Sequence, residues 1–511
     1  VALLWRWFQD RFDPHLTGNR ERAAQLSRDR LDDELRAITD HDQDIAFRTL
    51  TNLVESTLRT NFYQSRRPYH YLSFKIDCGQ VTTMPLPRMQ YEIYVHHREV
   101  EGVHLRGGPI ARGGIRWSDR ADYRQEILGL VTTQMVKNVL IVPEGAKGGF
   151  YVKHAHPDPR GRRAQADALY QVFIQGLLDL TDDIRDEQVM PPPETVRYDG
   201  HDPYLVVAAD KGTAHLSDTA NGLARTHGFW LDDAFASGGS NGYDHKEVGI
   251  TARGAWQAAR VHFLEMGHDP DADEFTAMGI GDPSGDVFGN GVLETRKMRL
   301  LAAFNHLHVF LDPGPDTEVA YNERQRLFRE CKGWDHYDTA LISEGGGVFS
   351  RRAKSIPLTP QLQQLLGVLG DEIEVDAAIR LLLRMNVDLF WNGGIGTYVK
   401  ASTETHPEAL DPPNDTIRIN ADELRCRIVA EGGNLGFTQA GRVEYALGGG
   451  RINTDAIDNS GGVDMSDHEV NLKILLAQEV GARRLKGDAR DALIRKFTDE
   501  IAHQVLANND L

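Results

Sequence analysis

Three apolar runs in this chain of 511 residues pass directly into glycine-rich turns. The runs are FTAMGI at 275–280, VDLFW at 387–391 and RIVAE at 427–431, and the turns are GDPSGD, NGGIGT and GGN. An apolar run that ends in a glycine turn is typical of a buried strand in a parallel sheet, where the turn leads into a crossover helix. The pattern predicts an α/β chain with a doubly wound sheet, although ordinary βα loops also use glycine.

The first of these runs has the order strand, glycine turn, helix that is typical of a dinucleotide-binding fold. We expect the helix from about Val292 to Phe304, with backbone amides at its start holding a pyrophosphate. The candidate residues are Gly279, Gly281, Ser284 and Gly285. The glycine spacing has one residue too many for GxGxxG, so a purely structural glycine turn is equally compatible with it.

The next predicted strand, HLHVFLD at 306–312, ends at Asp312. An acidic side chain at this point binds an adenosine ribose hydroxyl and repels a 2′-phosphate, which favours NAD over NADP. Its spacing from Gly281 exceeds the usual ~20 residues, whereas counting from Gly291 restores it. Gly394, in the turn after 387–391, is expected to lie over the nicotinamide, because a doubly wound sheet gathers such turns at the ends of its strands.

The stretch 111–153 gathers cationic side chains around glycines. Its middle predicts a helix, because apolar residues recur there at helical spacing, namely Ile127, Leu128, Val131, Met135 and Val139. Lys137 borders this face, and Lys147 follows in a predicted loop with paired glycines. Repulsion between two lysines and burial would both bring an ammonium closer to neutrality, as general acid–base catalysis requires. A solvated surface lysine beside a glycine turn is the alternative.

Two further polar positions stand at element boundaries. LVVAAD at 205–210 is an apolar run ending in Asp210, and a carboxylate at the tip of a buried parallel strand points toward the ligand crevice. An N-cap for the following helix is the other interpretation of Asp210. Ser466 and Glu469 form an SxxE pattern before an apolar periodic run, which predicts a capping box at a helix start.

Composition excludes several classes of protein. A net charge of −18 argues against general nucleic-acid binding and an anionic membrane surface. The cysteines Cys78, Cys331 and Cys426 form no CxxC pair, which favours a reducing cytoplasm and gives no support for a zinc site. No apolar run approaches a membrane span and no secretory leader opens the chain. We expect a cytoplasmic protein without a metal, and a chain that is part of a longer polypeptide.

Several motifs together resemble the glutamate dehydrogenases, most closely their large NAD-specific bacterial branch. They are ARGGIRWSDR at 111–120, MVKN at 135–138, PEGAKGG at 143–149 and DNSGGVDMSDHE at 458–469. The resemblance covers nearly the whole chain after about Leu50. It implies an α/β substrate lobe and a Rossmann NAD-binding lobe with an active-site cleft between them. The implied domains are a helical segment at 1–75, a substrate domain at 76–231, a nucleotide domain at 232–454, and returning helices at 455–511.

The resemblance also implies catalytic roles. Lys137 would bind the α-carboxylate of glutamate, Lys147 would activate the attacking water, and Asp210 would move protons to and from the nitrogen. The implied reaction is the reversible oxidative deamination of L-glutamate to 2-oxoglutarate and ammonia with NAD. Related enzymes form homo-oligomers, so one is expected here.

The remaining implied contacts concern the substrate side chain and the nicotinamide. Arg112, Gly114 and Ser466 belong to the substrate site, with Arg112 and Ser466 on the γ-carboxylate; small relatives have lysine in place of Arg112. Thr251 and Asn434 match positions that contact the nicotinamide ribose and ring. Two alternatives remain: a dehydrogenase for another side chain, which should have apolar residues in place of Arg112 and Ser466, and a non-catalytic NAD-binding module.

Overall fold

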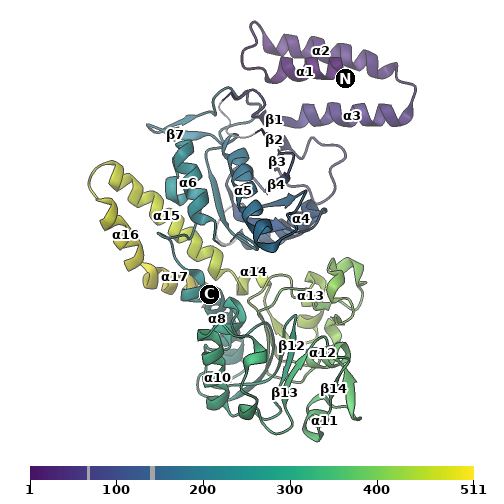
Figure 1. The fold of residues 1–511 in the computed structure, drawn as a ribbon, viewed down its shortest axis with the longest axis vertical. Coiled ribbons are helices and arrows are strands. Elements are labelled where there is room, and N and C mark those ends of the chain that lie inside the picture. Colours follow the sequence, from purple (N-terminus) through teal and green to yellow (C-terminus); the bar gives the residue numbers. More distant parts are fainter. Residues whose placement is uncertain (66–69, 139–143, 214, 511) are drawn as a thin grey trace. The chain divides into compact units, whose positions relative to one another are not determined.

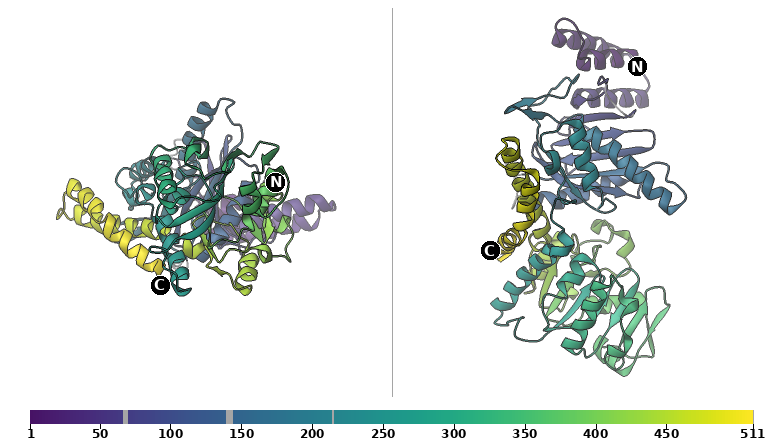
Figure 2. Two further views of the ribbon diagram at one scale, coloured as in Figure 1. Left: turned by 90° about the horizontal axis from the view of Figure 1, so that it is seen from below. Right: turned by 60° about the vertical axis from the view of Figure 1, so that its left-hand side comes forward.

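The computed structural model describes residues 1–65, 70–138, 144–213 and 215–510, without the side chains of residues 133, 134, 136–138, 245 and 246. The chain forms two compact units, each traced in Figures 1 and 2. Unit 1 contains Val1–Tyr243 and Ser466–Arg495, and unit 2 contains Asp244–Met465 and Lys496–Leu511. Within the described ranges, every helix is too short or too polar to cross a membrane.

Unit 1 is built on a seven-stranded mixed sheet in the order β1-β2-β3-β4-β6-β5-β9. Its strands are β1 (Thr57–Thr60), β2 (Leu72–Asp77), β3 (Tyr91–His96), β4 (Val100–Arg106), β5 (Ala111–Ser118), β6 (Ala146–Val152) and β9 (Leu205–Ala209). The strands from β1 to β4 pair antiparallel, and β4 is also antiparallel to β6. Because β5 is parallel to both β6 and β9, these three strands end at one edge of the sheet.

Helices cover both faces of this sheet, with α5 and α6 side by side on one face and α4 on the other (Figure 1). The helices of unit 1 are α1 (Ala2–Phe12), α2 (Arg20–Arg36), α3 (His41–Ser56), α4 (Tyr123–Asn138), α5 (Pro159–Leu178), α6 (Ser217–His227), part of α15 (Gly461–Gly481) and α16 (Gly487–Lys496), which ends at the boundary with unit 2; β7 (Asp183–Arg185) and β8 (Gln188–Met190) form a hairpin. α5 begins where Pro159 takes the first helical position and the Asp158 side chain accepts the Gly161 amide.

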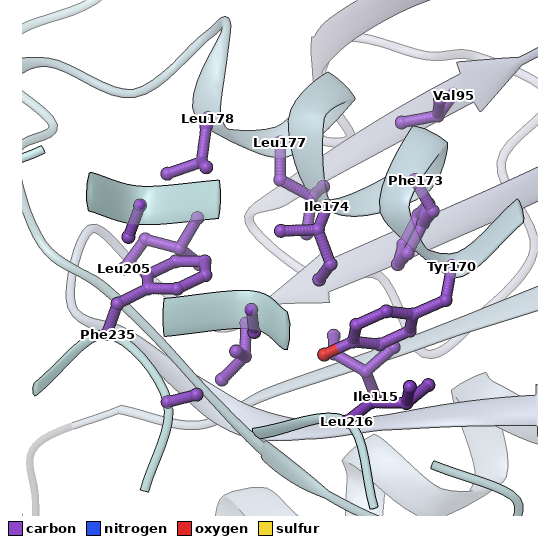
Figure 3. Packing of buried hydrophobic residues seen from close by; sticks show 14 of the residues in the cluster. Val95, Ile115, Tyr170, Phe173, Ile174, Leu177, Leu178, Leu205, Leu216 and Phe235 are labelled. Carbon is purple, nitrogen blue, oxygen red and sulfur yellow. The ribbon is translucent and has the colours of Figure 1, made fainter. Parts of the chain in front are cut away.

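The larger core of unit 1 lies between the sheet and α5 (Figure 3). Tyr170, Phe173 and Ile174 of α5 pack there with Ile115 of β5, and all four are buried. Side chains of a strand alternate between faces, so the neighbours of Ile115 in β5 point to the face that α4 covers. This alternation directs Gly114 and Arg116 to the same side as the α4 helix.

A buried ion network holds the segment that leads into β9. Lys75 Nζ lies 2.6 Å from Asp199 Oδ2 and 2.7 Å from Asp202 Oδ2. Arg106 donates from Nη1 to the same Asp202 oxygen at 2.8 Å, and Arg59 donates from Nε to Asp199 at 2.6 Å. Because both carboxylates stand just before β9, the network fixes where this strand enters the sheet.

Unit 2 contains a second seven-stranded sheet, in the order β13-β12-β11-β10-β16-β19-β20. Its strands are β10 (Phe275–Ile280), β11 (Met298–Phe304), β12 (His308–Leu311), β13 (Gly347–Ser350), β16 (Leu389–Asn392), β19 (Ile428–Glu431) and β20 (Arg451–Ile452). The five strands from β11 to β20 in this order are parallel, and β12 and β13 add an antiparallel edge. The order reverses between β10 and β16, which is where open α/β sheets bind ligands.

Helices also lie on both faces of this second sheet. They are α7 (His245–Val248), α8 (Ile250–Glu265), α9 (Asp286–Gly291), α10 (Thr317–Arg329), α11 (Pro360–Leu366), α12 (Val375–Leu383), α13 (Gln439–Leu447), α14 (Asp455–Asp458) and α17 (Thr498–Asp510); the short strands are β14 (Ser355–Pro357), β15 (Glu372–Glu374), β17 (Val399–Lys400) and β18 (Ile419–Asn420). Phe390 of β16 packs in the core with α12, whereas its neighbours Leu389 and Trp391 pack in the core with α8. The predicted α/β, doubly wound class is confirmed.

Four predictions about segments differ from the structure. The predicted helix over 292–304 is wrong: the helix is α9, which ends at Gly291, and 298–304 is strand β11. The predicted helical segment 1–75 includes β1 and most of β2 of the unit 1 sheet. The chain enters unit 2 after Tyr243 rather than after 231, and α17 packs against α8 in unit 2 instead of returning to unit 1.

Candidate active site

Three adjacent strands of unit 1 bring Lys147, Gly114 and Asp210 to one face of the sheet. Ile115 pairs with Gly148 and Gly114 pairs with Ala208, so Lys147 in β6 lies beside Gly114 in β5, and Asp210 follows β9. The Lys147 ammonium forms an ion pair with the Asp210 carboxylate. A Cβ at Gly114 would lie 3.0 Å from Lys147 Nζ and 3.2 Å from Asp210 Cβ. The glycine therefore lets the lysine lie across β5 to reach the aspartate.

Asp210 is held by a second cation on the same face. Arg116 donates to both carboxylate oxygens of Asp210, at 3.3 and 3.2 Å, and to Glu126 of α4 at 2.9 Å. The backbone amide of Lys211 donates to Asp210 at 2.7 Å. Burial favours the protonated acid, but the attraction of Lys147 and Arg116 outweighs burial and holds the pKa of Asp210 well below its usual range. Asp210 is therefore a carboxylate at neutral pH.

The Arg112 side chain, in the same strand β5, contacts the second turn of α15. Its Nη2 donates to Ser466 Oγ at 2.8 Å, and its Nη1 lies 2.6 Å from Asp467 Oδ1. The side chains of Arg112 and Asp467 are only 4% and 10% exposed, so this ion pair is nearly free of solvent. The predicted substrate residues Arg112 and Ser466 are thus brought together, with an additional carboxylate beside them.

The predicted capping box at Ser466 is wrong, because α15 begins at Gly461 and Ser466 lies inside it. Glu469 instead accepts the backbone amides of Gly238 at 2.8 Å and Tyr243 at 3.0 Å, and pairs with Lys473 at 2.8 Å. These contacts fix α15 against unit 1. The Ser466 hydroxyl is left to accept the hydrogen bond from Arg112.

Three other predictions for this region are either revised or concern residues outside the described ranges. Lys147 lies in strand β6, not in a loop; Cβ atoms at Gly148 and Gly149 would clash with Ile115 and with Ile127 of α4, so those glycines allow close packing. Asp210 is not an N-cap, since the next helix, α6, starts at Ser217. The side chain of Lys137 lies outside the described residues, as does all of Val139.

The predicted cofactor glycines of unit 2 lie at the carboxyl ends of its parallel strands. Gly279 is in β10, Gly281 follows this strand with φ +149°, and a Cβ on Gly281 would lie 2.4 Å from Phe288 Cβ of α9. Gly394 follows β16, and its carbonyl would be 2.6 Å from a Cβ on Gly433, which follows β19. Only residues without side chains allow these turns to approach so closely. Such a glycine-lined edge at the switch point fits a dinucleotide.

The remaining predicted residues at this edge lie in the turns and at the helix starts beside it. Ser284 donates to Asp282 from its backbone amide at 3.0 Å and from its hydroxyl at 2.7 Å, and Gly285 is the N-cap of α9. Thr251 lies in the first turn of α8, where a Cβ on Gly462 would be 2.7 Å from its hydroxyl. Asn434 accepts a 2.9 Å hydrogen bond from Asn459.

The structure contradicts the predicted ribose-binding role of Asp312. β12 is antiparallel to β11, so Asp312 lies beside Leu301, well away from the carboxyl end of β11 at Phe304. Asp312 is also fully buried and accepts hydrogen bonds from the amide and hydroxyl of Ser343. The residue that follows β11 is Asn305, whose side chain donates to Asp282 of the glycine turn at 2.7 Å.

Four residues beside the predicted ones were missed: Arg116, Asn305, Asn459 and Asp467. Arg116 stands two residues after Gly114 in a strand, so strand alternation alone would have directed it to the same face. Asn305 stands 20 residues after Gly285, the spacing expected for a ribose contact. Among the described residues, no group of three or more His, Cys, Asp or Glu side chains could hold a metal ion.

A family model and similar curated relatives indicate the same protein family. A family model described as "Bacterial NAD-glutamate dehydrogenase, catalytic domain" matches residues 30–511. The chain is 52% identical to an NAD-specific glutamate dehydrogenase of Mycobacterium tuberculosis, over 98% of this chain and 32% of that protein. It is 51% identical to one of Halomonas elongata, over the same shares. The chain spans about a third of the length of these curated relatives.

One solved structure with which the chain aligns is the hetero-hexameric glutamate dehydrogenase from Thermus thermophilus in its Leu-bound form. The alignment covers 86% of this chain and 81% of that chain, at 15% identity and a TM-score of 0.48.

Proposed function

Because this chain belongs to the family of bacterial NAD-glutamate dehydrogenase catalytic domains, we propose that it catalyses the reversible oxidative deamination of L-glutamate to 2-oxoglutarate and ammonia, with NAD as cofactor. The observation that carries this proposal is the ion pair between Lys147 and Asp210 across Gly114. It joins an ammonium and a carboxylate on one face of the sheet, as a reaction that moves protons at both oxygen and nitrogen requires.

Each of these two groups has a defined part in the proposed reaction. Asp210 stays deprotonated at neutral pH because of its cationic neighbours, so it can accept a proton from the substrate nitrogen. Lys147, as the neutral amine, accepts the proton that water loses when it adds to the iminium carbon, and the resulting ammonium stabilises the oxygen of the tetrahedral intermediate as ammonia leaves. Arg116 is a positioning residue, since its two contacts to Asp210 fix the orientation of the carboxylate.

Arg112 and Ser466 are proposed to bind the γ-carboxylate of the substrate. A guanidinium can hold a carboxylate through two parallel hydrogen bonds, and a hydroxyl beside it can donate a third. Polar groups at this point do not suit a leucine or phenylalanine side chain, which would leave them buried without partners. Lys137, in α4, is proposed to hold the α-carboxylate.

NAD is proposed to bind at the glycine-lined edge of unit 2, and when bound it supplies the hydride acceptor. The residues proposed to contact it are Thr251, Gly279, Gly281, Ser284, Gly285, Gly394 and Asn434, with Asn305 in place of Asp312. We also propose a homo-oligomeric, cytoplasmic protein; the absence of disulfides among its three cysteines is consistent with a reducing compartment. Light scattering of the purified protein measures the oligomeric state.

The test of this function follows the absorbance of NADH with glutamate, leucine or phenylalanine as substrate. Of the three amino acids, we expect only glutamate to be oxidised. The variant Lys147→Ala should lose this turnover, while calorimetry still detects NAD binding. Lys153→Ala is the matched control, because Lys153 directly follows the same strand and pairs with Glu101 at 2.7 Å, away from Asp210. Unchanged turnover in Lys147→Ala would refute the proposed role of Lys147.

A further inference from the structure

Asp467 stands beside the two residues proposed to bind the substrate side chain. Its Oδ1 lies 2.6 Å from Arg112 Nη1, while Arg112 Nη2 donates to Ser466 at 2.8 Å. Ser466 and Asp467 are consecutive residues of α15, and both are buried with Arg112. The guanidinium therefore has an anionic partner from the protein itself.

This pairing has a consequence for any incoming carboxylate. Arg112 carries one positive charge, and Asp467 already balances it in a site that is almost closed to solvent. A substrate carboxylate that binds Arg112 places a second negative charge next to the first. At low effective dielectric two such charges repel strongly, so the substrate and Asp467 compete for one guanidinium.

We propose that Asp467 is an internal competitor for the dicarboxylate substrate: it holds Arg112 in the free protein and yields the guanidinium, wholly or in part, to the distal carboxylate of the ligand. The inference rests on the proposed function, because it assigns that carboxylate to Arg112. It makes Asp467 a determinant of how tightly dicarboxylates bind.

The variant Asp467→Asn tests the competition. It removes the charge at nearly constant shape and leaves a buried guanidinium without its counter-ion, which destabilises the free protein. A bound dicarboxylate supplies the missing counter-ion, so the variant should bind it more tightly than the wild type. Glutarate is the probe, since it has both carboxylates and no amine to oxidise.

We expect the glutarate Kd to fall by about tenfold in Asp467→Asn, equivalent to about 1.4 kcal/mol. At a fixed glutarate concentration the rise in Tm should be correspondingly larger than in the wild type. The KM for glutamate should also be lower in Asp467→Asn than in the wild type. Butyrate, which has one carboxylate fewer, should show a smaller difference between the two proteins.

Asp233→Asn is a matched control for the loss of a buried ion pair. Asp233 pairs with Arg490 at 2.7 Å, with side chains 9% and 10% exposed, in the same unit. This variant also loses a buried ion pair, with Arg490 keeping its contact to Asp491 at 3.0 Å, and its response to glutarate should equal that of the wild type. A gain in glutarate affinity in both variants would indicate a general loosening of unit 1 and would overturn the inference.

The other possible outcomes would each support or overturn the inference. If Asp467→Asn binds glutarate no more tightly than the wild type, or more weakly, Asp467 orients Arg112 and does not compete. Asp467→Ser removes the same charge with a smaller side chain, and purification of either variant in excess glutarate should recover folded protein; failure of both would overturn the proposal. Glutamate turnover by the wild type is measured separately, so failure of the proposed function is distinguished from failure of this inference.

Discussion

The substitution Gly114→Ala tests whether the position of Lys147 above strand β5 matters. The new Cβ would lie 3.0 Å from Lys147 Nζ, 3.2 Å from Asp210 Cβ and 3.4 Å from the Ala209 carbonyl. Ordinary contacts begin at about 3.4 Å, so the ammonium must withdraw by roughly 0.4 Å. A misplacement of about 1 Å can reduce a rate ~100-fold, so a shift of this size is expected to lower kcat/KM about tenfold.

The fold should tolerate this substitution. Gly114 does not have a positive φ, and the closest of the three atoms belongs to the flexible end of a side chain. Replacing glycine by alanine also reduces the freedom of the unfolded chain by about 0.4–1 kcal/mol, which offsets part of the crowding. We therefore expect a Tm close to that of the wild type, measured by calorimetry, together with the reduced kcat/KM measured by NADH absorbance.

Two other glycines of unit 1 serve as controls. Gly222→Ala in α6 meets nothing within 4 Å and should raise stability by up to ~1 kcal/mol with no effect on turnover. Gly113→Ala would place its Cβ 1.6 Å from the backbone carbonyl of Ala146, and only a shift of the sheet itself could relieve this clash, so unit 1 should fail to fold. Wild-type kcat/KM in Gly114→Ala would refute the argument that Lys147 acts from its position across β5.

Three further substitutions test other parts of the structure. Ser466→Ala removes the 2.8 Å hydrogen bond from the Arg112 guanidinium, and steady-state kinetics should show the KM for glutamate about tenfold higher with NAD affinity unchanged; an unchanged KM would exclude Ser466 from the substrate site. Asp312→Asn weakens a buried interaction with Ser343, so urea unfolding should show a loss of about 1–3 kcal/mol while the ratio of kcat/KM for NAD and NADP stays the same; a changed ratio would restore Asp312 to the cofactor site. Burial raises the pKa of Asp458 to about 7, above the ~3.9 of an unfolded aspartate. The folded protein therefore binds more protons, and this residue contributes stability that is lost as pH rises from about 4 to about 7, by up to ~4 kcal/mol. Asp458→Asn should reduce that loss in urea unfolding at several pH values, and equal pH dependence in the two proteins would contradict the assignment.

The glycine turns could be predicted from the sequence because their cause is local. An apolar run that ends in glycine carries both the burial and the backbone freedom of a strand end, and β10, β16 and β19 end within one residue of these runs. The strand at 298–304 could not be identified in the same way. A short apolar run fits a buried strand and a buried helix equally, and only its pairing with β10 and β12, distant in the chain, decides between them.

The wrong prediction for Asp312 has the same cause as the missed strand at 298–304. Three residues, 305–307, separate β11 from β12. A parallel crossover needs a dozen residues or more. A connection of three residues therefore requires an antiparallel pair. Once 298–304 is recognised as a strand, Asp312 must lie beside Leu301, away from the carboxyl end of β11 and the glycine turn.

The start of α15 was misjudged because packing overrides local preference. Gly461 and Gly462 disfavour a helix by propensity, yet a Cβ on Gly461 would lie 2.8 Å from the Ile250 carbonyl and one on Gly462 would lie 2.7 Å from Thr251 Oγ1. The helix begins with glycines because α8 lies so close. By contrast, Arg112 and Ser466, which are 354 residues apart, were paired correctly only through the resemblance of their motifs.

Unit 1 is assembled from two stretches of chain, and all of Asp244–Met465 is synthesised between them. α15 completes this unit, since Val470 enters its core and Glu469 holds the amides of Gly238 and Tyr243. A nascent chain that has reached Met465 therefore carries every strand of the first sheet but exposes the apolar surface that α15 covers. Such exposed surface is prone to aggregation and attracts chaperones during translation. A polypeptide truncated after Met465 should accordingly be recovered in inclusion bodies, although all strands of its first sheet are present.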